Sequence, residues 1–249
     1  MILRAPRQRV VWLVRHGQTN WNRLGWVQGH LGSPRLTLRG RAQARRVASL
    51  LVTKDVRVVY SSDLRRTRCT AEIIAERLAC PVRTDARLRE RDFGQLEGSP
   101  AGALRPEVTG RDRGRVADLA AHPPGGESLD DLAARCADFA GWLEARPNDG
   151  DAVTVAHGGS IRLLRAALCG TEPSGMTWGS VANASVHRLV LRSPTPLTSL
   201  SLVPTVHTAS TRDRPLEETV RSDPFGTDDP PRTHRMVGRP STPPSELIE

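Results

Sequence analysis

The run Val10-Val11-Trp12-Leu13-Val14, followed at once by Arg15-His16-Gly17, decides how this chain of 249 residues is expected to fold. Short β-branched runs of this kind predict strands of a mostly parallel sheet when helical segments separate them. Gly17 permits a tight turn out of the strand. In open parallel sheets, ligands collect just beyond the carboxyl ends of the strands. The residues that follow each strand are therefore the first candidates for function.

Similar short runs recur along the chain and alternate with longer segments of helical period. The predicted strands are Val10–Val14, Val56–Tyr60, Ala152–Ala156 and Ser185–Leu191. The predicted helices are Arg39–Leu51, Arg65–Leu78, Leu129–Arg146 and Ser160–Leu168. This alternation is the pattern of βαβ units. We expect a single α/β domain over residues 1–192, a three-layer sandwich whose mostly parallel central sheet is flanked by helices.

The composition changes near residue 193. Residues 194–249 hold ten of the nineteen prolines, are rich in Ser, Thr and Asp, and show no sustained apolar period. Such composition predicts a Pro/Ser/Thr-rich disordered tail over residues 193–249, whose role stays open. The tail carries a net charge of −2 and the whole chain +9, so residues 1–193 carry +11. The positive field belongs to the folded part, where it favours small anionic ligands.

Composition also argues against several classes of protein. The arginines are dispersed and aromatic residues make up only 4% of the chain, so we expect no nucleic-acid partner. No apolar run approaches a membrane span or a signal-peptide core, so we expect neither a membrane partner nor secretion. The four cysteines show neither CxxC pairing nor regular spacing, which favours the reducing cytoplasm; they are Cys69, Cys80, Cys136 and Cys169.

Three predicted strands deliver polar residues to one edge of the sheet. These are Arg15-His16-Gly17, Ser61 to Arg66, and His157-Gly158-Gly159. Alone, a histidine at a strand end or an arginine in a first helical turn usually has an ordinary structural role. Together they match a phosphoryl group, which needs several fixed cationic donors around its oxygens.

With these residues in place, the sequence resembles the histidine phosphatase superfamily, which includes phosphoglycerate mutases and many phosphomonoesterases. The resemblance runs from about Val10 to Leu191. It rests on Leu13–Thr19 with Trp21-Asn22, Gln28–Leu31, Ser61–Thr67, Leu88–Glu90 with Phe93-Gly94 and Glu97-Gly98, Pro124–Ser128, and Val155–Gly159. It implies a phosphoglycerate mutase-like fold.

The resemblance also implies a role for each matching residue. His16 would be the nucleophile and Glu90 the proton donor. Asn22 and Gln28 match positions that line the same pocket. The residues implied to bind the phosphoryl group are Arg15, Arg66 and His157.

The chemistry of these residue types agrees with those roles. A neutral His16 imidazole can attack phosphorus and form a covalent phosphohistidine. Two arginines and a cationic His157 would stabilise the charge on the transferring oxygens. We find no Asp or Glu cluster that would hold a pair of divalent ions, so we expect neither a metal nor another cofactor.

A departing alkoxide needs a proton, which a carboxylic acid can supply. Glu90 is the leading candidate, although it lies in a charged run that could be a solvated loop. Asp63 and Glu97 are the alternatives, and Asp63 more plausibly orients an arginine.

Two stretches depart from the family pattern. Residues 32–37, Gly32-Ser33-Pro34-Arg35-Leu36-Thr37, border the expected pocket and leave the leaving group open. Residues 99–122 are rich in arginine and form either a mobile lid whose arginines meet an acidic substrate or a solvated loop. Glu90 to Gly125 is short and polar, so water should enter easily, which favours hydrolysis over intramolecular transfer.

The sequence therefore predicts a cytoplasmic, metal-independent phosphomonoesterase that hydrolyses a small phosphorylated metabolite through a phosphohistidine on His16. The first alternative is a bisphosphoglycerate-dependent phosphoglycerate mutase. A less favoured alternative is a non-catalytic module that binds a phospho-ligand or a protein. The physiological substrate and the oligomeric state stay open.

Overall fold

The computed structural model describes residues 8–147, 149–191 and 217–220. Its central sheet has six strands in the order β3-β2-β6-β1-β7-β8. The strands are β1 (Arg9–Arg15), β2 (Val56–Ser61), β3 (Val82–Thr84), β6 (Asp151–Ala156), β7 (Val186–Leu191) and β8 (Glu217–Val220). The first four in the sheet order pair in parallel, whereas β7 pairs antiparallel with β1 and β8 pairs antiparallel with β7. The prediction of an α/β fold with a mostly parallel sheet is confirmed.

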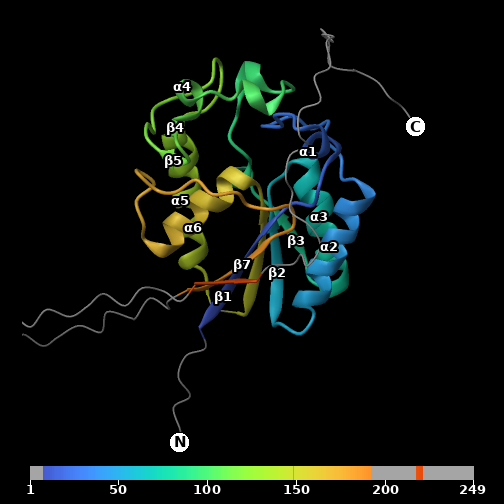
Figure 1. Cartoon of the computed structure of the whole chain (residues 1–249). Coiled ribbons are helices and arrows are strands. Elements are labelled where there is room, and N and C mark those ends of the chain that lie inside the picture. Colours follow the sequence, from blue (N-terminus) through green and yellow to red (C-terminus); the bar gives the residue numbers. More distant parts are fainter. Residues whose placement is uncertain (1–7, 148, 192–216, 221–249) are drawn as a thin grey trace, which may run out of the picture.

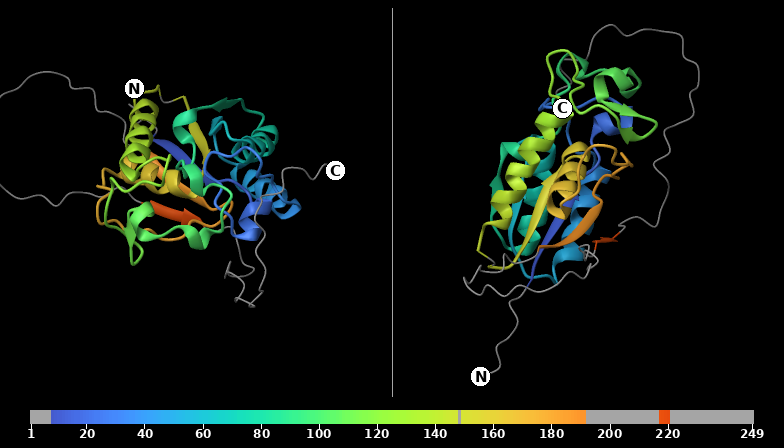
Figure 2. Two further views of the ribbon diagram at one scale, coloured as in Figure 1. Left: turned by 90° about the horizontal axis from the view of Figure 1, so that it is seen from above. Right: turned by 90° about the vertical axis from the view of Figure 1, so that its left-hand side faces the viewer.

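Helices cover both faces of this sheet, which gives three layers (Figures 1 and 2). On one face lie α2 (Leu38–Leu51) and α3 (Arg65–Leu78), and on the other lie α5 (Leu129–Glu144) and α6 (Gly158–Cys169). Smaller elements stand at the carboxyl ends of the parallel strands, at the top of Figure 1. They are α1 (Asn20–Leu24), α4 (Pro106–Thr109) and a hairpin of β4 (Arg111–Asp112) and β5 (Arg115–Val116).

Two apolar clusters hold the layers together, and β1 contributes to both. Val11 and Leu13 pack on the α5–α6 side, while Trp12 and Val14 pack on the α2–α3 side. Successive side chains of a strand point to opposite faces, so the unbroken run of apolar residues is what a strand covered on both faces requires. All four side chains are at most 4% exposed, which fixes the register of β1 in the sheet.

The predicted elements agree closely with the observed ones, with differences at their ends. Helix α6 begins at Gly158, two residues before its predicted start, because the Ser160 hydroxyl accepts a hydrogen bond from the His157 N–H at 3.1 Å and caps the helix. Helix α5 ends at Glu144 and not at Arg146. Strand β3 was not predicted because three residues are too few to show a period.

Strand β8 lies within the stretch predicted to be a disordered tail. Residues 217–220 pair antiparallel with β7, with Val186 opposite Val220. The ladder hydrogen bonds that an edge strand offers do not depend on an apolar period. The disordered tail stays a prediction. The rest of the predicted tail lies outside the described residues.

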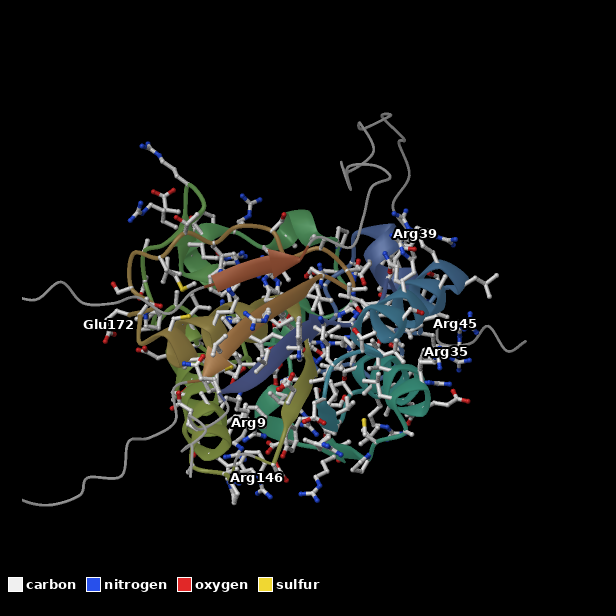
Figure 3. All side chains as sticks on the ribbon, turned by 90° about the horizontal axis from the view of Figure 1, so that it is seen from below. Arg9, Arg35, Arg39, Arg45, Arg146 and Glu172 are labelled. Carbon is white, nitrogen blue, oxygen red and sulfur yellow. The ribbon has the colours of Figure 1, made fainter. Side chains whose placement is uncertain are left out.

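Arginine side chains are spread over the molecule (Figure 3). Arg9 and Arg146 lie together on one part of it, and Arg35, Arg39 and Arg45 lie around α2 on another. The absence of a nucleic-acid partner stays a prediction.

Candidate active site

The register of the parallel strands brings the predicted site residues together. Arg15, the last residue of β1, stands opposite Ala156 of β6, and Ser61 of β2 stands opposite Val155. The chain therefore leaves all three strands at the same edge of the sheet. His16 and His157 are the next residues along two of these strands, and their rings meet edge to face with centroids 5.2 Å apart.

The His16 ring has a defined proton position. Its Nδ1 lies 2.8 Å from the Gly17 carbonyl oxygen, which can only accept a hydrogen bond. Nδ1 therefore carries a proton, and in the neutral ring the Nε2 lone pair is free. Burial lowers the pKa of His16 well below its usual value of 6.5, and the positive charges of Arg15 and Arg66 lower it further, against the opposing Gly17 carbonyl. The ring is neutral at pH 7.

The His157 ring is the opposite tautomer to that of His16. The Arg66 Nε–H donates to His157 Nδ1 at 3.3 Å, so the neutral ring carries its proton on Nε2. His157 Nε2 is buried and has no hydrogen-bond partner among the described residues. Burial, followed by the charge of Arg66, lowers the pKa of His157 well below 6.5. The prediction of a cationic His157 is therefore wrong for this arrangement, since a buried imidazole beside arginines disfavours the proton.

Arg66 comes from the first turn of α3 and is only 1% exposed. Besides its bond to His157, it donates to the carbonyls of Leu31 at 3.0 Å and Gly29 at 2.6 Å. The Gln28–Leu31 stretch thus holds the guanidinium in place. Burial lowers the pKa of Arg66 to about 10, which leaves it a cation at pH 7.

Arg15 is anchored by the connection between α6 and β7. Its Nη1 donates to the Val181 carbonyl, and its own carbonyl accepts from the Ala184 N–H. The connection between α6 and β7 therefore runs alongside the end of β1. Asn183 in this connection donates to the His16 carbonyl at 3.2 Å.

Glu90 lies at the start of α6, beside the histidines. Both of its carboxylate oxygens accept from the Gly159 N–H, at 3.0 and 3.1 Å. A Cβ at residue 159 would lie 2.3 Å from Glu90 Oε1, so only glycine lets the carboxylate approach so closely. A Cβ built at Gly158 would lie 3.8 Å from both Glu90 Oε2 and Arg15 Nε. The carboxylate and the Arg15 guanidinium therefore flank the same helix start.

A half-buried ion pair holds the backbone around Glu90. Arg135 of α5 donates to both carboxylate oxygens of Glu127, at 2.6 and 2.8 Å. The same guanidinium donates to the Glu90 carbonyl at 2.8 Å and to the carbonyls of Arg87 and Arg89. His30 contributes a further bond to the Glu90 carbonyl, from Nε2 at 2.8 Å. Glu90 is thus placed by side chains from two distant segments.

The two alternative carboxylates have other partners. Asp63 accepts from Arg89 Nε at 2.8 Å and from its Nη2, and the Arg89 hydrogen bond lowers the pKa of Asp63. The prediction that Asp63 orients an arginine is confirmed. Glu97 accepts from the N–H groups of His30 and Phe93, at 2.6 and 3.1 Å, while burial raises its pKa.

Asn22 and Gln28 are linked to His16 through other polar residues. The Asn22 Oδ1 caps α1 by accepting from the Thr19 N–H at 3.1 Å, and it also accepts from Asn183 Nδ2 at 3.2 Å. Gln28 Oε1 accepts from the Thr19 hydroxyl at 3.1 Å. Because Asn183 also bonds to the His16 carbonyl, Asn22 is connected to the nucleophile candidate through one amide.

Sequence reasoning missed three polar residues of this site. They are Arg135, Asn183 and Arg162, whose Nη1 donates to the Gly158 carbonyl at 2.7 Å. Arg135 and Arg162 lie within amphipathic helices, where an arginine usually faces solvent, and Asn183 lies in a loop without a pattern. The Gly-Gly pair at residues 158–159 was the available signal, since it predicts a close approach to the start of α6.

No three His, Cys, Asp or Glu side chains within residues 8–147, 149–191 and 217–220 are grouped so that they could hold a metal ion. In that same part of the chain, no helix has the length and apolar content needed to cross a membrane.

The sequence and the structure are similar to those of known phosphate-handling proteins. "Probable phosphoglycerate mutase GpmB" of Salmonella choleraesuis (strain SC-B67) is 35% identical over 221 residues, which cover 85% of this chain and 99% of the relative. A structure of mycobacterial glucosyl-3-phosphoglycerate phosphatase with inorganic phosphate has a TM-score of 0.61 and 34% identity, covering 73% of this chain and 89% of that one.

A phosphoserine phosphatase mutant from Entamoeba histolytica, in complex with phosphoserine, has a TM-score of 0.64 and 27% identity, covering 77% of this chain and 95% of that one. The sequence profile of the histidine phosphatase superfamily (branch 1) matches residues 11–200. This match spans more than half of the chain and includes both histidines and both arginines of the site. The chain belongs to the histidine phosphatase superfamily.

Proposed function

We propose that this protein is a phosphomonoesterase that hydrolyses a small phosphorylated metabolite through a phosphohistidine on His16. The observation that carries the proposal is the arrangement of the two imidazoles. His16 offers an unprotonated Nε2, while His157 offers a buried Nε2–H with no partner among the described residues. A phosphoryl group between them would meet a nucleophile on one side and a hydrogen-bond donor on the other.

In the first step, His16 Nε2 forms a bond to phosphorus as the bond from phosphorus to the leaving oxygen breaks. The negative charge on the phosphoryl oxygens would be stabilised by Arg15, Arg66 and the His157 Nε2–H. These fixed donors supply the charge that a divalent ion supplies in other phosphatases, so we propose that the reaction needs no metal.

Glu90 transfers a proton in each of the two steps, first as an acid and then as a base. As a carboxylic acid it would protonate the leaving oxygen and become a carboxylate. The carboxylate would then take a proton from water as the water oxygen bonds to phosphorus and the bond to His16 breaks. This step releases phosphate and restores the neutral His16 ring and the protonated Glu90. We place Asn22 and Gln28 as supports of the pocket wall through Thr19.

The test is turnover of p-nitrophenyl phosphate by His16→Ala. We expect a loss of at least about 10³-fold in kcat, because the residues of a covalent mechanism act as a unit. His122→Ala is the matched control, since His122 is exposed and contacts only a nearby carbonyl. Intact-mass spectrometry after rapid acid quenching should detect a phosphoryl adduct on the wild type and none on His16→Ala. Equal activity of the two proteins would remove His16 from the mechanism.

The named relative of Salmonella supports a second candidate, a phosphoglycerate mutase. A mutase must shield its phosphohistidine from water, and the segment between Glu90 and Gly125 is short and polar here. Incubation with 3-phosphoglycerate separates the two: we expect release of inorganic phosphate, whereas formation of 2-phosphoglycerate without phosphate would favour the mutase.

We also propose a cytoplasmic location. No disulfide joins any of the four cysteines to another described residue, and Cys136 is buried with its pKa raised by burial to about 12. The lack of disulfides within the described part of the chain agrees with a reducing compartment.

A further inference from the structure

Two arginines from separate elements flank one indole next to the active site. The Arg162 guanidinium of α6 lies 4.7 Å from the centroid of the Trp178 ring, and the Arg111 guanidinium of β4 lies 5.2 Å from the same centroid. Trp178 lies in the connection between α6 and β7. Its N–H donates to the Gly114 carbonyl at 2.7 Å and holds the β4–β5 hairpin against this connection. We call Arg111, Arg162 and Trp178 the double-arginine site.

The double-arginine site lies beside the proposed acid. Arg162 Nη1 donates to the Gly158 carbonyl at 2.7 Å. A Cβ built at Gly158 would lie 3.4 Å from Arg162 Nη1 and 3.8 Å from Glu90 Oε2, so the two groups are neighbours across the start of α6. The charge of Glu90 also acts on Arg111, whose pKa burial lowers. The double-arginine site therefore adjoins the Glu90 carboxylate.

The two arginines keep hydrogen-bond donors that the described residues do not use. Arg162 donates to the carbonyls of Gly158 and Gly179, which leaves one N–H on each of its terminal nitrogens. Arg111 makes no side-chain hydrogen bond to any described residue and is only partly exposed. Burial lowers the pKa of Arg162 to about 10, and the repulsion of the positive charges of Arg15 and Arg111 lowers it further, against the charge of Glu90. A bound anion would offset that repulsion.

Resting on the proposed function, we infer that Arg111 and Arg162 bind a second negative charge carried by the leaving group. The acid that protonates the leaving oxygen must adjoin the leaving group, so donors next to Glu90 and away from His16 face that group. The substrate would then be a phosphate monoester of an anionic alcohol, with a carboxylate or a second phosphate near the ester. Planar guanidinium groups suit either oxyanion.

Binding to a non-reacting variant tests this inference apart from catalysis. In a His16→Ala background, calorimetry would compare 3-phosphoglycerate with glycerol 3-phosphate, which has a hydroxymethyl group where the former has its carboxylate. We expect Arg111→Gln to weaken binding of 3-phosphoglycerate at least about tenfold, the usual size of a charge-assisted hydrogen bond, and to change binding of glycerol 3-phosphate less than about twofold. Arg111→Lys should recover part of the loss, because it keeps the charge.

Arg113→Gln is the matched control. Arg113 stands two residues away on the same hairpin and is exposed, so its removal should leave both affinities unchanged. The inference would be overturned if Arg111→Gln lowered the affinity for both ligands equally or for neither. It would also be overturned if Arg113→Gln lowered the affinity for 3-phosphoglycerate as much as Arg111→Gln does.

Turnover separates this inference from the proposed function. With active enzyme, the ratio of kcat/KM for 3-phosphoglycerate to that for glycerol 3-phosphate should exceed about ten and should fall in Arg111→Gln. The pair 1,3-propanediol bisphosphate and 1,3-propanediol monophosphate tests the second phosphate as the source of the charge. Tighter binding of the ligands with a second negative charge, without hydrolysis of any of them, would uphold the double-arginine site and reject the phosphatase. Hydrolysis of all four compounds at similar kcat/KM would uphold the phosphatase and reject the double-arginine site.

Discussion

The edge of the sheet and the hairpin above it carry arginines under very different constraints. Arg66, at the edge, is 1% exposed and donates to three fixed acceptors. Arg113, on the hairpin, is exposed. A buried guanidinium can hold one geometry for a reaction, whereas donors on a short hairpin can change with little effect on the core. We therefore propose that the edge of the sheet carries out the phosphoryl chemistry and that the hairpin selects the leaving group.

Among the changes that test this difference between edge and hairpin, the largest effect should follow from changing the shape of an edge cation while keeping its charge. Arg66→Lys replaces a planar fork that reaches His157, Gly29 and Leu31 by a single ammonium group. We expect kcat/KM for p-nitrophenyl phosphate to fall about 10²- to 10³-fold, as for loss of a fixed transition-state donor. Arg65→Lys, at the exposed neighbouring position, should have no effect. Near-wild-type activity of Arg66→Lys would break the comparison.

A single methyl group should displace the proposed acid. In Gly159→Ala the new Cβ would collide with Glu90 Oε1, and we expect turnover of alkyl phosphates to fall about 100-fold. Turnover of p-nitrophenyl phosphate should fall much less, because its leaving group needs little protonation. Gly141→Ala is the control: Gly141 lies in α5 with open space around it and should gain about 0.5–1 kcal/mol in free energy of unfolding. An equal loss with both substrates would argue against Glu90 as the acid.

Arg135 should act as a positioning residue for Glu90. Arg135→Met removes the bonds to the Glu90 and Arg89 carbonyls and leaves Glu127 without its partner. We expect about a tenfold loss with alkyl phosphates and less than about threefold with p-nitrophenyl phosphate, together with a lower melting temperature. Arg68→Met, at an exposed site on α3, should change neither quantity. A leaving-group-independent loss would indicate a purely structural role.

The buried histidines should make the stability of the sheet edge depend on pH. Both have pKa values well below 6.5 in the folded protein, whereas an unfolded chain titrates near 6.5. Below that pH the unfolded chain binds protons that the folded chain does not, so the free energy of unfolding falls as pH is lowered. The slope is at most about 1.4 kcal/mol per pH unit for each histidine.

Urea unfolding between pH 7 and pH 5 measures this slope. His157→Gln should reduce it, and His122→Gln, at an exposed position, should leave it unchanged. The same slope in wild type and His157→Gln would contradict a lowered pKa of His157 in the folded protein.

Much of the fold could be predicted because the apolar pattern and the sheet geometry agree. The Val10–Val14 run is covered on both faces, so no alternative register would bury it equally well. The convergence of Arg15, His16 and His157 then follows from parallel pairing alone. Glu90 could be proposed only from the resemblance, because its loop is charged and without a period. Its placement depends on Gly159, Arg135 and Glu127, which are far away in the chain.

Local periodicity and the positions of the strand ends are enough to predict that a buried parallel sheet carries two histidines and two arginines at one edge. The tautomer of each histidine, the neutral state of His157 and the meeting of Arg111 and Arg162 at Trp178 follow only from the packing of distant segments. Proton positions depend on the particular carbonyl or guanidinium that lies within hydrogen-bond distance. Contacts between segments about fifty residues apart arise only when the chain packs, and no local pattern records them.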